Sequence, residues 1–188
     1  NFSLRRGSRI FLNGKNGCGK SSLIRASLGR IHERDGNGVT EDARISHVSA
    51  DGKNALWESG TLEAASGITV SYVNQDTAFL EGSISEFCRE RKLDESLFCS
   101  LLRQLGLERR QLSGCLEEFS QGQKKKVLIA ASVMTPAHLY IWDEPLNYMD
   151  VFSRIQLEEL ILSAATTMMI VEHDVRFREK IATQLIEM

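Results

Sequence analysis

The sequence predicts an α/β fold in which a parallel sheet carries helices on both faces. Short apolar runs that end in polar residues alternate with longer segments of helical periodicity, which is the pattern of strands joined by crossover helices. A glycine-rich turn also joins the first predicted strand directly to the first predicted helix. With 188 residues, 42% of them hydrophobic, the chain is long enough for one domain with its own core.

The first third of the chain predicts a strand, a helix and a less regular segment. Residues 9–12 are an apolar strand, and residues 22–29 have helical spacing with Gly29 as the expected stop. Residues 30–60 show no sustained periodicity and predict a loop-rich insertion. Residues 61–64 and 68–73 then predict a small antiparallel hairpin around a turn of small residues.

Residues 83–133 predict a helical subdomain. Apolar residues recur there at spacings of three and four, which indicates two helices broken near Leu93, the second capped by Asp94. A third helix is expected to begin at Ser120, whose hydroxyl can cap it, and Pro136 bars its continuation.

The last fifty residues predict strands and helices in alternation. Residues 138–145 form a buried strand that ends in Asp143 and Glu144, and residues 167–173 form a second apolar strand. Residues 174–188 predict a helix and a closing strand. Between the two apolar strands, residues 151–164 predict a helix whose expected core residues are Val151, Ile155, Leu160 and Ile161.

Composition narrows the class of protein. Lys and Arg total 23 against 25 Asp and Glu, so a net charge of −2 excludes a domain-wide basic field for nucleic acid. The three lysines at 124–126 predict a solvated helix face, with contact to RNA phosphates as the less favoured alternative.

Cysteine spacing and hydropathy indicate a cytosolic setting. Cys18, Cys88, Cys99 and Cys115 are too widely spaced for a zinc site or a disulfide scaffold, so we expect reduced thiols. The apolar stretches fall short of the roughly 20 residues that a membrane helix needs. The chain begins with Asn1 rather than Met, and we expect a fragment of a longer polypeptide.

Residues 14–21, "GKNGCGKS", predict a phosphate-binding loop. They fit the pattern G-x-x-x-x-G-K-[ST] and lie between a strand and a helix. Glycines let backbone N–H groups converge on an anion, while Lys20 is expected to contact the β and γ phosphates and Ser21 to bind Mg²⁺. The residues predicted to contact nucleotide here are Asn13, Gly14, Asn16, Gly17, Cys18, Gly19, Lys20, Ser21 and Ser22.

Asp143 and Glu144 complete a hydrolytic site in this prediction. The strand before them delivers both carboxylates to the edge of the sheet at which the phosphate-binding loop opens. Asp143 is expected to hold magnesium, and Glu144 to act as the general base toward water.

The segment "FSQGQKKK" resembles the LSGGQ signature of ATP-binding cassette (ABC) proteins. Ser120, Gly122 and Gln123 match it, and Gln121 replaces the usual first glycine. Three further motifs occur along the chain in the order that the family shows. Gln75, before the signature, resembles the Q-loop, and Asp150 and His173, after it, resemble the D-loop and the switch histidine. The resemblance covers nearly the whole chain.

The resemblance implies a P-loop NTPase fold of the ABC nucleotide-binding type, with a parallel core sheet, a small antiparallel hairpin and a helical signature subdomain. It implies ATP and Mg²⁺ as cofactors and ATP hydrolysis that needs a paired cassette. Glu144, His173 and Gln75 would be catalytic, and Ser21, Gln75 and Asp143 would hold the metal. The nucleotide contacts implied in the signature and D-loop are Ser120, Gly122, Gln123 and Asp150.

The segment "EPLNYMD" resembles the "EPTNHLD" of the ABC-F family, with Asn147 matching and Tyr148 in place of His. The chain looks most like the second cassette of antibiotic-resistance proteins of the Lsa and Vga type. That resemblance implies a cytoplasmic protein that protects the ribosome, with a second cassette in the same polypeptide, or a homodimer of the fragment, as partner.

Two alternatives stay open at the level of sequence. The ATPase subunit of a membrane transporter shares all of these motifs and would dock to a membrane partner instead of a ribosome. A regulatory cassette would bind ATP without useful turnover, and Gln121 is the residue that favours it.

Overall fold

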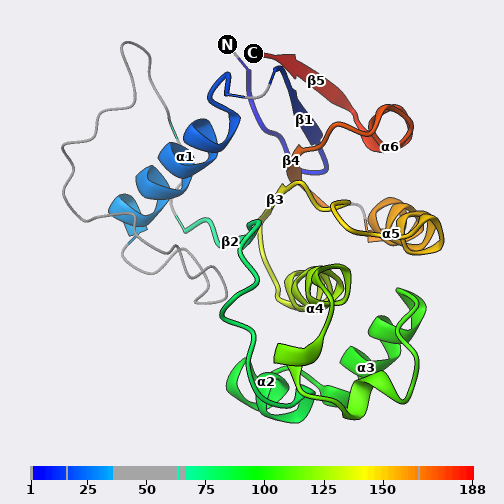
Figure 1. Ribbon diagram of the computed structural model, residues 1–188. Helices are drawn as coiled ribbons and strands as arrows, with labels where there is room; N and C mark the ends of the chain where they lie inside the picture. Colours follow the sequence, from blue (N-terminus) through cyan, green and yellow to red (C-terminus); the bar gives the residue numbers. More distant parts are fainter. Residues whose placement is uncertain (1, 16, 36–62, 64–66, 165) are drawn as a thin grey trace.

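A parallel five-stranded sheet forms the centre of the part of the chain that the computed structural model describes, residues 2–15, 17–35, 63, 67–164 and 166–188. The strand order is β2-β3-β4-β1-β5, and every neighbouring pair is parallel, as predicted (Figure 1). The strands are β1 (Arg9–Asn13), β2 (Val70–Val73), β3 (Leu139–Asp143), β4 (Met168–Val171) and β5 (Gln184–Glu187).

Helices cover both faces of this sheet. Helix α1 lies on one face, and α4, α5 and α6 lie on the other, with α2 and α3 packed beyond α4 (Figure 1). Among the described residues, no helix is both long and apolar enough to cross a bilayer. The helices are α1 (Lys20–Asp35), α2 (Ile84–Glu90), α3 (Glu95–Gln104), α4 (Gln121–Met134), α5 (Val151–Ala164) and α6 (Val175–Ile181).

The alternation of side chains along β1 divides the core in two. Ile10 and Leu12 are buried in the cluster that includes Ile24 of α1, whereas Phe11 belongs to the cluster on the opposite face. Phe11 meets the ring of Phe177 edge-on, with 5.8 Å between the ring centroids. The strand is therefore held from both faces, which fixes where its carboxyl end emerges.

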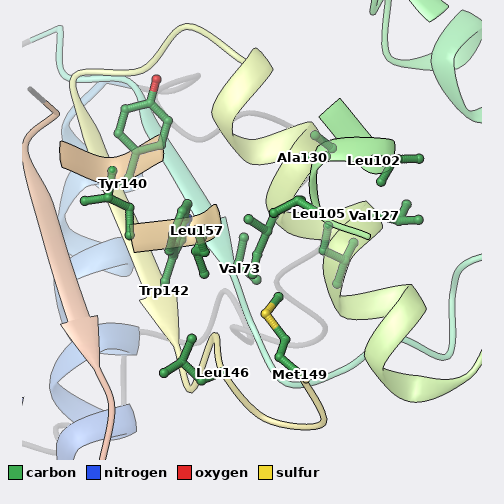
Figure 2. Packing of buried hydrophobic residues seen from close by; sticks show 14 of the residues in the cluster. Val73, Leu102, Leu105, Val127, Ala130, Tyr140, Trp142, Leu146, Met149 and Leu157 are labelled. Atoms are coloured by element: carbon green, nitrogen blue, oxygen red, sulfur yellow. The ribbon is translucent and has the colours of Figure 1, made fainter. Parts of the chain in front are cut away.

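The loop after β3 is anchored in the second of these clusters. Leu146 is 2% exposed and Met149 is 5% exposed. Figure 2 shows both side chains in the cluster that contains Trp142 of β3 and Leu157 of α5. The segment that carries Glu144 is therefore tied to the core by its own apolar residues.

The capping predictions in the helical subdomain are confirmed. Asp94 accepts a hydrogen bond from the N–H of Leu97 and begins α3, after a break that includes Leu93. Ser120 caps α4, which ends at Met134, two residues before Pro136. These boundaries depend on residues close together in the chain, so they could be predicted from the sequence alone.

The prediction that the first helix stops at Gly29 is wrong, because α1 continues to Asp35. A glycine inside a helix costs only about 1 kcal/mol, and Ile31, 4% exposed, extends the apolar contact beyond it. The predicted insertion at 30–60 therefore begins inside the helix, and residues 36–60 lie outside the described part of the chain.

The second arm of the predicted antiparallel hairpin belongs to the parallel sheet instead. Val70–Val73 pairs with β3 in parallel register, Val70 opposite Leu139. Three of the four residues of β2 are buried, which is typical of a strand covered on both faces rather than of a half-exposed hairpin. The first arm, apart from Glu63, lies outside the described residues.

The predicted inner face of the helix at 151–164 is partly wrong. Val151 and Ile155 are 73% and 43% exposed, whereas Ser153, Leu157 and Ile161 are buried. Spacings of four place these last three on one stripe. The helix is apolar on more than one side, so periodicity did not single out the buried stripe.

Candidate nucleotide-binding site

A cleft of about 280 Å³ opens where the N-terminus of α1 meets the carboxyl ends of β3 and β4. In a parallel sheet the carboxyl ends of the strands share one edge, and ligands bind there. The residues that line the cleft are Gly17, Gly19, Lys20, Ser21, Ser22, Glu144 and Val171.

The turn between β1 and α1 has the conformation expected of an anion cradle. Gly17 and Gly19 have backbone φ angles of 81° and 101°, which residues that carry a Cβ rarely adopt. The Lys20 Nζ, 7% exposed, donates to the carbonyl oxygens of Gly14 at 2.8 Å and Lys15 at 3.0 Å. The ammonium thus lies inside the loop, beside the free N–H groups at the start of α1.

Asn13 and Cys18, which were also predicted to contact nucleotide, have different neighbours in the structure. The Asn13 Nδ2 donates to the Glu187 carboxylate at 2.9 Å, and its Oδ1 accepts from Arg178 at 2.9 Å. Both ends of the Asn13 side chain are thus engaged with β5 and α6. The Cys18 Sγ lies 3.9 Å from the Lys20 Nζ, and Asn16 lies outside the described residues.

Ser21 and Asp143 meet across 122 positions of sequence. The Ser21 Oγ donates to the Asp143 Oδ2 at 3.2 Å. Asp143 is 4% exposed, and its Oδ1 is buried with no hydrogen-bond partner among the described residues. An unpartnered buried carboxylate oxygen beside a hydroxyl fits a divalent cation, since magnesium is held by one or two carboxylates together with phosphate oxygens.

The electrostatics of Asp143 agree with this geometry. Burial raises the pKa of Asp143, the Ser21 hydrogen bond lowers it, and the charge of Glu144 raises it again. The charge of Lys125 and the side chain of Gln75 lower the pKa of Asp143. A cation in this place would favour the ionised form that burial disfavours.

Glu144 is held in a strained conformation at the mouth of the cleft. Its φ is 50°, in the left-handed region, which costs about 1–3 kcal/mol for a residue with a side chain. Its N–H donates to the Val171 carbonyl at 2.8 Å, and its Oε2 accepts from the Asn147 Nδ2. Its Oε1 lies 3.9 Å from the His173 Nε2. The two predicted catalytic side chains are therefore adjacent.

The predicted signature residues form a second group that does not line the cleft. Ser120 and Gln123 bond to each other in a capping box, with Ser120 N to Gln123 Oε1 at 2.8 Å and Gln123 N to Ser120 Oγ at 3.3 Å. A Cβ on Gly122 would overlap the carbonyl oxygen of Tyr148. Only glycine therefore lets the start of α4 approach the loop that contains Asp150.

Gln121 is turned toward the segment that follows Gln75. Its Oε1 accepts a hydrogen bond from the Thr77 Oγ1 at 2.7 Å, and Thr77 is 6% exposed. The side chain that replaces the usual glycine thus connects the start of α4 to this segment.

The solvated face predicted for residues 124–126 is wrong for two of the three lysines. Lys125 and Lys126 are 3% and 6% exposed. The Lys125 Nζ donates to the carbonyl oxygens of Asn74 at 2.9 Å and Asp143 at 3.0 Å, and burial lowers the pKa of Lys125 to about 8. The Lys126 Nζ pairs with the Asp150 carboxylate at 2.9 Å. Long alkyl stems let these ammonium groups reach partners behind the helix.

Two residues around the site, Glu172 and Arg154, were missed by sequence reasoning. Glu172 is 6% exposed directly before His173, and Arg154 of α5 bonds to the loop after β3. A charged residue at the end of an otherwise apolar strand is a signal that could have identified Glu172.

Comparison with known proteins supplies the family. The sequence profile of the ABC transporter family matches residues 1–147. The chain belongs to the ABC transporter family. The matched residues include the phosphate-binding turn, the signature segment and the pair Asp143 and Glu144.

Curated relatives of this cassette include ABC-F proteins. It is 26% identical to the ribosome protection protein VmlR of Bacillus subtilis, over 96% of this chain and 29% of that protein. It is also 26% identical to ABC transporter F family member 5 of Arabidopsis thaliana, over 100% of this chain and 24% of that protein. The cassette spans less than a third of each of these two relatives, and the relatives agree with an ABC-F nucleotide-binding domain.

Solved structures agree with the fold. The ATP-binding subunit of an ABC transporter superposes with a TM-score of 0.71 at 24% identity, over 100% of this chain and 77% of that one. An RNase-L inhibitor superposes with a TM-score of 0.68 at 23% identity, over 98% of this chain and 32% of that one. The similarity extends over the whole sheet and its helices.

Proposed function

We propose that this cassette binds Mg-ATP in the cleft and, paired with a second cassette, hydrolyses it. The observation that carries the proposal is the contact of 3.2 Å between Ser21 and Asp143, together with the buried Oδ1 of Asp143, which has no hydrogen-bond partner within the described part of the chain. Ser21, Asp143 and Gln75 would hold magnesium, which would supply charge stabilisation on the phosphates. Lys20 and the N–H groups of the turn would bind those phosphates.

Glu144 and His173 would carry the proton chemistry. Asn147 occupies one carboxylate oxygen of Glu144, so the other, which faces His173, is available to accept a hydrogen bond from the attacking water. His173 would orient that water or the γ-phosphate from the opposite side. The strained backbone of Glu144 supports this role, since such strain clusters at active sites.

The signature group supports pairing with a second cassette. Ser120, Gly122 and Gln123 would meet nucleotide held by a partner, because they do not line the cleft of their own cassette. Beside Asp150, the apolar residues Tyr148 and Val151 are 76% and 73% exposed. Exposed apolar side chains grouped in this way favour a protein interface.

The ABC-F relatives support action on the ribosome in the cytoplasm. One of them is a ribosome protection protein, and the Asn147 that resembles the ABC-F motif contacts the proposed general base. We therefore propose that the parent protein acts on ribosomes, with antibiotic resistance by target protection as its specific role.

A trapping variant tests hydrolysis and pairing together. In the full-length parent protein, Glu144→Gln should slow phosphate release and leave ATP bound in this cassette, because the amide cannot accept the proton of the water. Size-exclusion chromatography of this chain with Mg-ATP should then show the paired form. Glu158→Gln, which alters a partly buried carboxylate of α5 that pairs with Lys180, is the matched control. Unchanged phosphate release in the Glu144 variant would refute the assignment.

Co-sedimentation tests the cellular target. The Glu144→Gln parent protein with Mg-ATP should pellet with purified ribosomes and not with membrane vesicles. Binding to vesicles alone would favour the transporter alternative and reject the ribosomal one.

A further inference from the structure

Glu172 is a buried acidic residue that the proposed hydrolysis does not use directly. It follows β4 (Met168–Val171) and is 6% exposed. It is not among the residues that line the nucleotide cleft. A carboxylate rarely becomes this buried unless its oxygens are satisfied by hydrogen bonds.

Both carboxylate oxygens of Glu172 accept backbone N–H groups, from two different loops. Oε2 accepts from the N–H of Leu146 at 3.0 Å, in the loop after β3. Oε1 accepts from the N–H groups of His173 at 2.7 Å and Asp174 at 3.3 Å, in the loop after β4. Glu172 is therefore a bridge between the loop of the proposed general base and the loop of the proposed switch histidine.

Hydrogen bonds on both sides of Glu144 hold its strained backbone in place. On one side, the Glu144 N–H donates to the Val171 carbonyl at 2.8 Å. On the other, the Leu146 N–H donates to Glu172. The left-handed backbone of Glu144, with φ of 50°, lies between these two bonds. Residues in such conformations persist only when their surroundings hold them there.

We propose that Glu172 is a positioning residue that holds Glu144 and His173 in register for hydrolysis. The inference rests on the proposed function, because it names what fixes the geometry of that same site. The side chain needs the full length of glutamate and an acceptor oxygen on each side to accept N–H groups from both loops. A misplacement of about 1 Å at a reacting group can cost about 100-fold in rate.

A second contact joins the same two loops and lets variants at Glu172 fold. Arg154 of α5 donates through Nε to the Met149 carbonyl at 3.1 Å and through Nη1 to the Asp174 carboxylate at 3.1 Å. Leu146 and Met149 are also buried in the core. Loss of the Glu172 bridge should therefore loosen the loops without unfolding them.

Two substitutions separate the features of the bridge. Glu172→Gln keeps the length, but one side of an amide is an NH₂ group that must face a backbone N–H donor. Glu172→Asp keeps the charge and the contacts to its neighbours His173 and Asp174, but it is one methylene too short to reach Leu146. Glu86→Gln is the matched control, since Glu86 also accepts a backbone N–H, from Ser83 at 2.8 Å in the helical subdomain.

The experiment measures ATPase kinetics of the full-length parent protein and amide hydrogen exchange at 144–149 and 172–174. Both Glu172 variants should lower kcat about 10- to 100-fold with KM changed less than about twofold, and the Leu146 amide should exchange faster. Glu86→Gln should match the unmodified protein in kcat and in exchange at these loops.

Each of the other outcomes would overturn the positioning role, either alone or together with the proposed function. Normal kcat in both variants, or a slowly exchanging Leu146 amide in both, would overturn the positioning role alone. A raised KM and a lowered melting temperature in both variants, with kcat intact, would show that the carboxylate has a purely structural role. This result would also overturn the positioning role. Absence of turnover in the unmodified parent protein would overturn the proposed function and the positioning role together.

Discussion

The nucleotide cleft and the signature group use polar residues in opposite ways. Beside the cleft, Asp143 bonds to the lining residue Ser21 and has a buried oxygen without a partner among the described residues, and Glu144, which lines the cleft, has a strained backbone. In the signature group, Ser120 and Gln123 satisfy each other in a capping box at the start of α4. The first region has a polar group that a ligand would satisfy, whereas in the second Ser120 and Gln123 satisfy each other.

This difference shows how a single cassette can separate binding from turnover. Groups left unsatisfied inside the protein favour the ligand that satisfies them, so the cleft should bind nucleotide within one chain. A preformed, self-satisfied helix start costs little to hold in place, so the signature group is suited to meet a surface from another molecule. Substitutions in the two regions should therefore have different consequences.

The largest effect is expected from Lys20→Ala in the cleft. Hydrogen bonds to charged groups contribute about 1.5–3 kcal/mol each, so loss of the ammonium should weaken ATP binding by about 100-fold. Isothermal titration calorimetry of this chain with Mg-ATP measures it. Lys180→Ala, on the surface of α6, is the control. Affinity retained within threefold would remove Lys20 from the phosphate site.

Gly122→Ala should instead impair the paired form alone. The added Cβ meets the Tyr148 carbonyl, and such overpacking costs about 1–3 kcal/mol, which is relieved by shifting the signature away from the loop. We expect ATPase turnover of the parent protein to fall about 10-fold while ATP affinity of this chain is unchanged.

Gly29→Ala is the control for that glycine substitution, because a Cβ there meets no atom of the described residues within 4 Å. If Gly122→Ala weakened ATP binding of this chain as much as it slowed turnover, the two regions would not be separable.

A smaller effect is expected for the contact between Gln121 and Thr77. A neutral hydrogen bond contributes about 1 kcal/mol net, so Thr77→Val and Gln121→Ala should each lower the free energy of unfolding, and the double variant should lose less than their sum. Urea denaturation of the four proteins in this cycle measures the coupling. Strictly additive losses would show that the contact contributes nothing.

The smallest effect concerns pH and Asp150. Burial raises its pKa, but hydrogen bonds from Lys126 and Ser153 outweigh burial and hold the pKa of Asp150 well below 3.8. A carboxylate with a depressed pKa stabilises the fold above its unfolded pKa, and this contribution is lost as the pH falls through the folded pKa.

The melting temperature of the unmodified chain should therefore exceed that of Asp150→Asn near pH 7. The gap should shrink as the pH falls below about 4. It should be modest, because the side chain is 56% exposed. A gap that stays constant between pH 7 and pH 3 would exclude this carboxylate as its source.

Elements with local signals could be predicted from sequence. The phosphate-binding turn, the caps at Asp94 and Ser120, and the buried strand before Asp143 each depend on residues within a few positions of one another. The parallel order of the sheet followed from the alternation of strands and helices.

Features that depend on contacts between residues far apart in the sequence could not be predicted from it. Lys125 is buried because carbonyl oxygens 51 and 18 positions away accept its ammonium group, and nothing in a run of three lysines indicates this. Helix α1 passes Gly29 because Ile31, beyond it, is buried in the core. Glu172 and Gln121 likewise acquire their roles from partners on other elements.

The magnesium dependence of ATP binding tests most directly whether Ser21 and Asp143 form a metal-nucleotide site. ATP affinity of this chain is measured by calorimetry with Mg²⁺ and with EDTA, for the unmodified chain and for Ser21→Ala. We predict that Mg²⁺ tightens binding to the unmodified chain and that Ser21→Ala loses most of this gain while ATP affinity in EDTA stays the same. An equal gain from Mg²⁺ in both proteins would contradict the account.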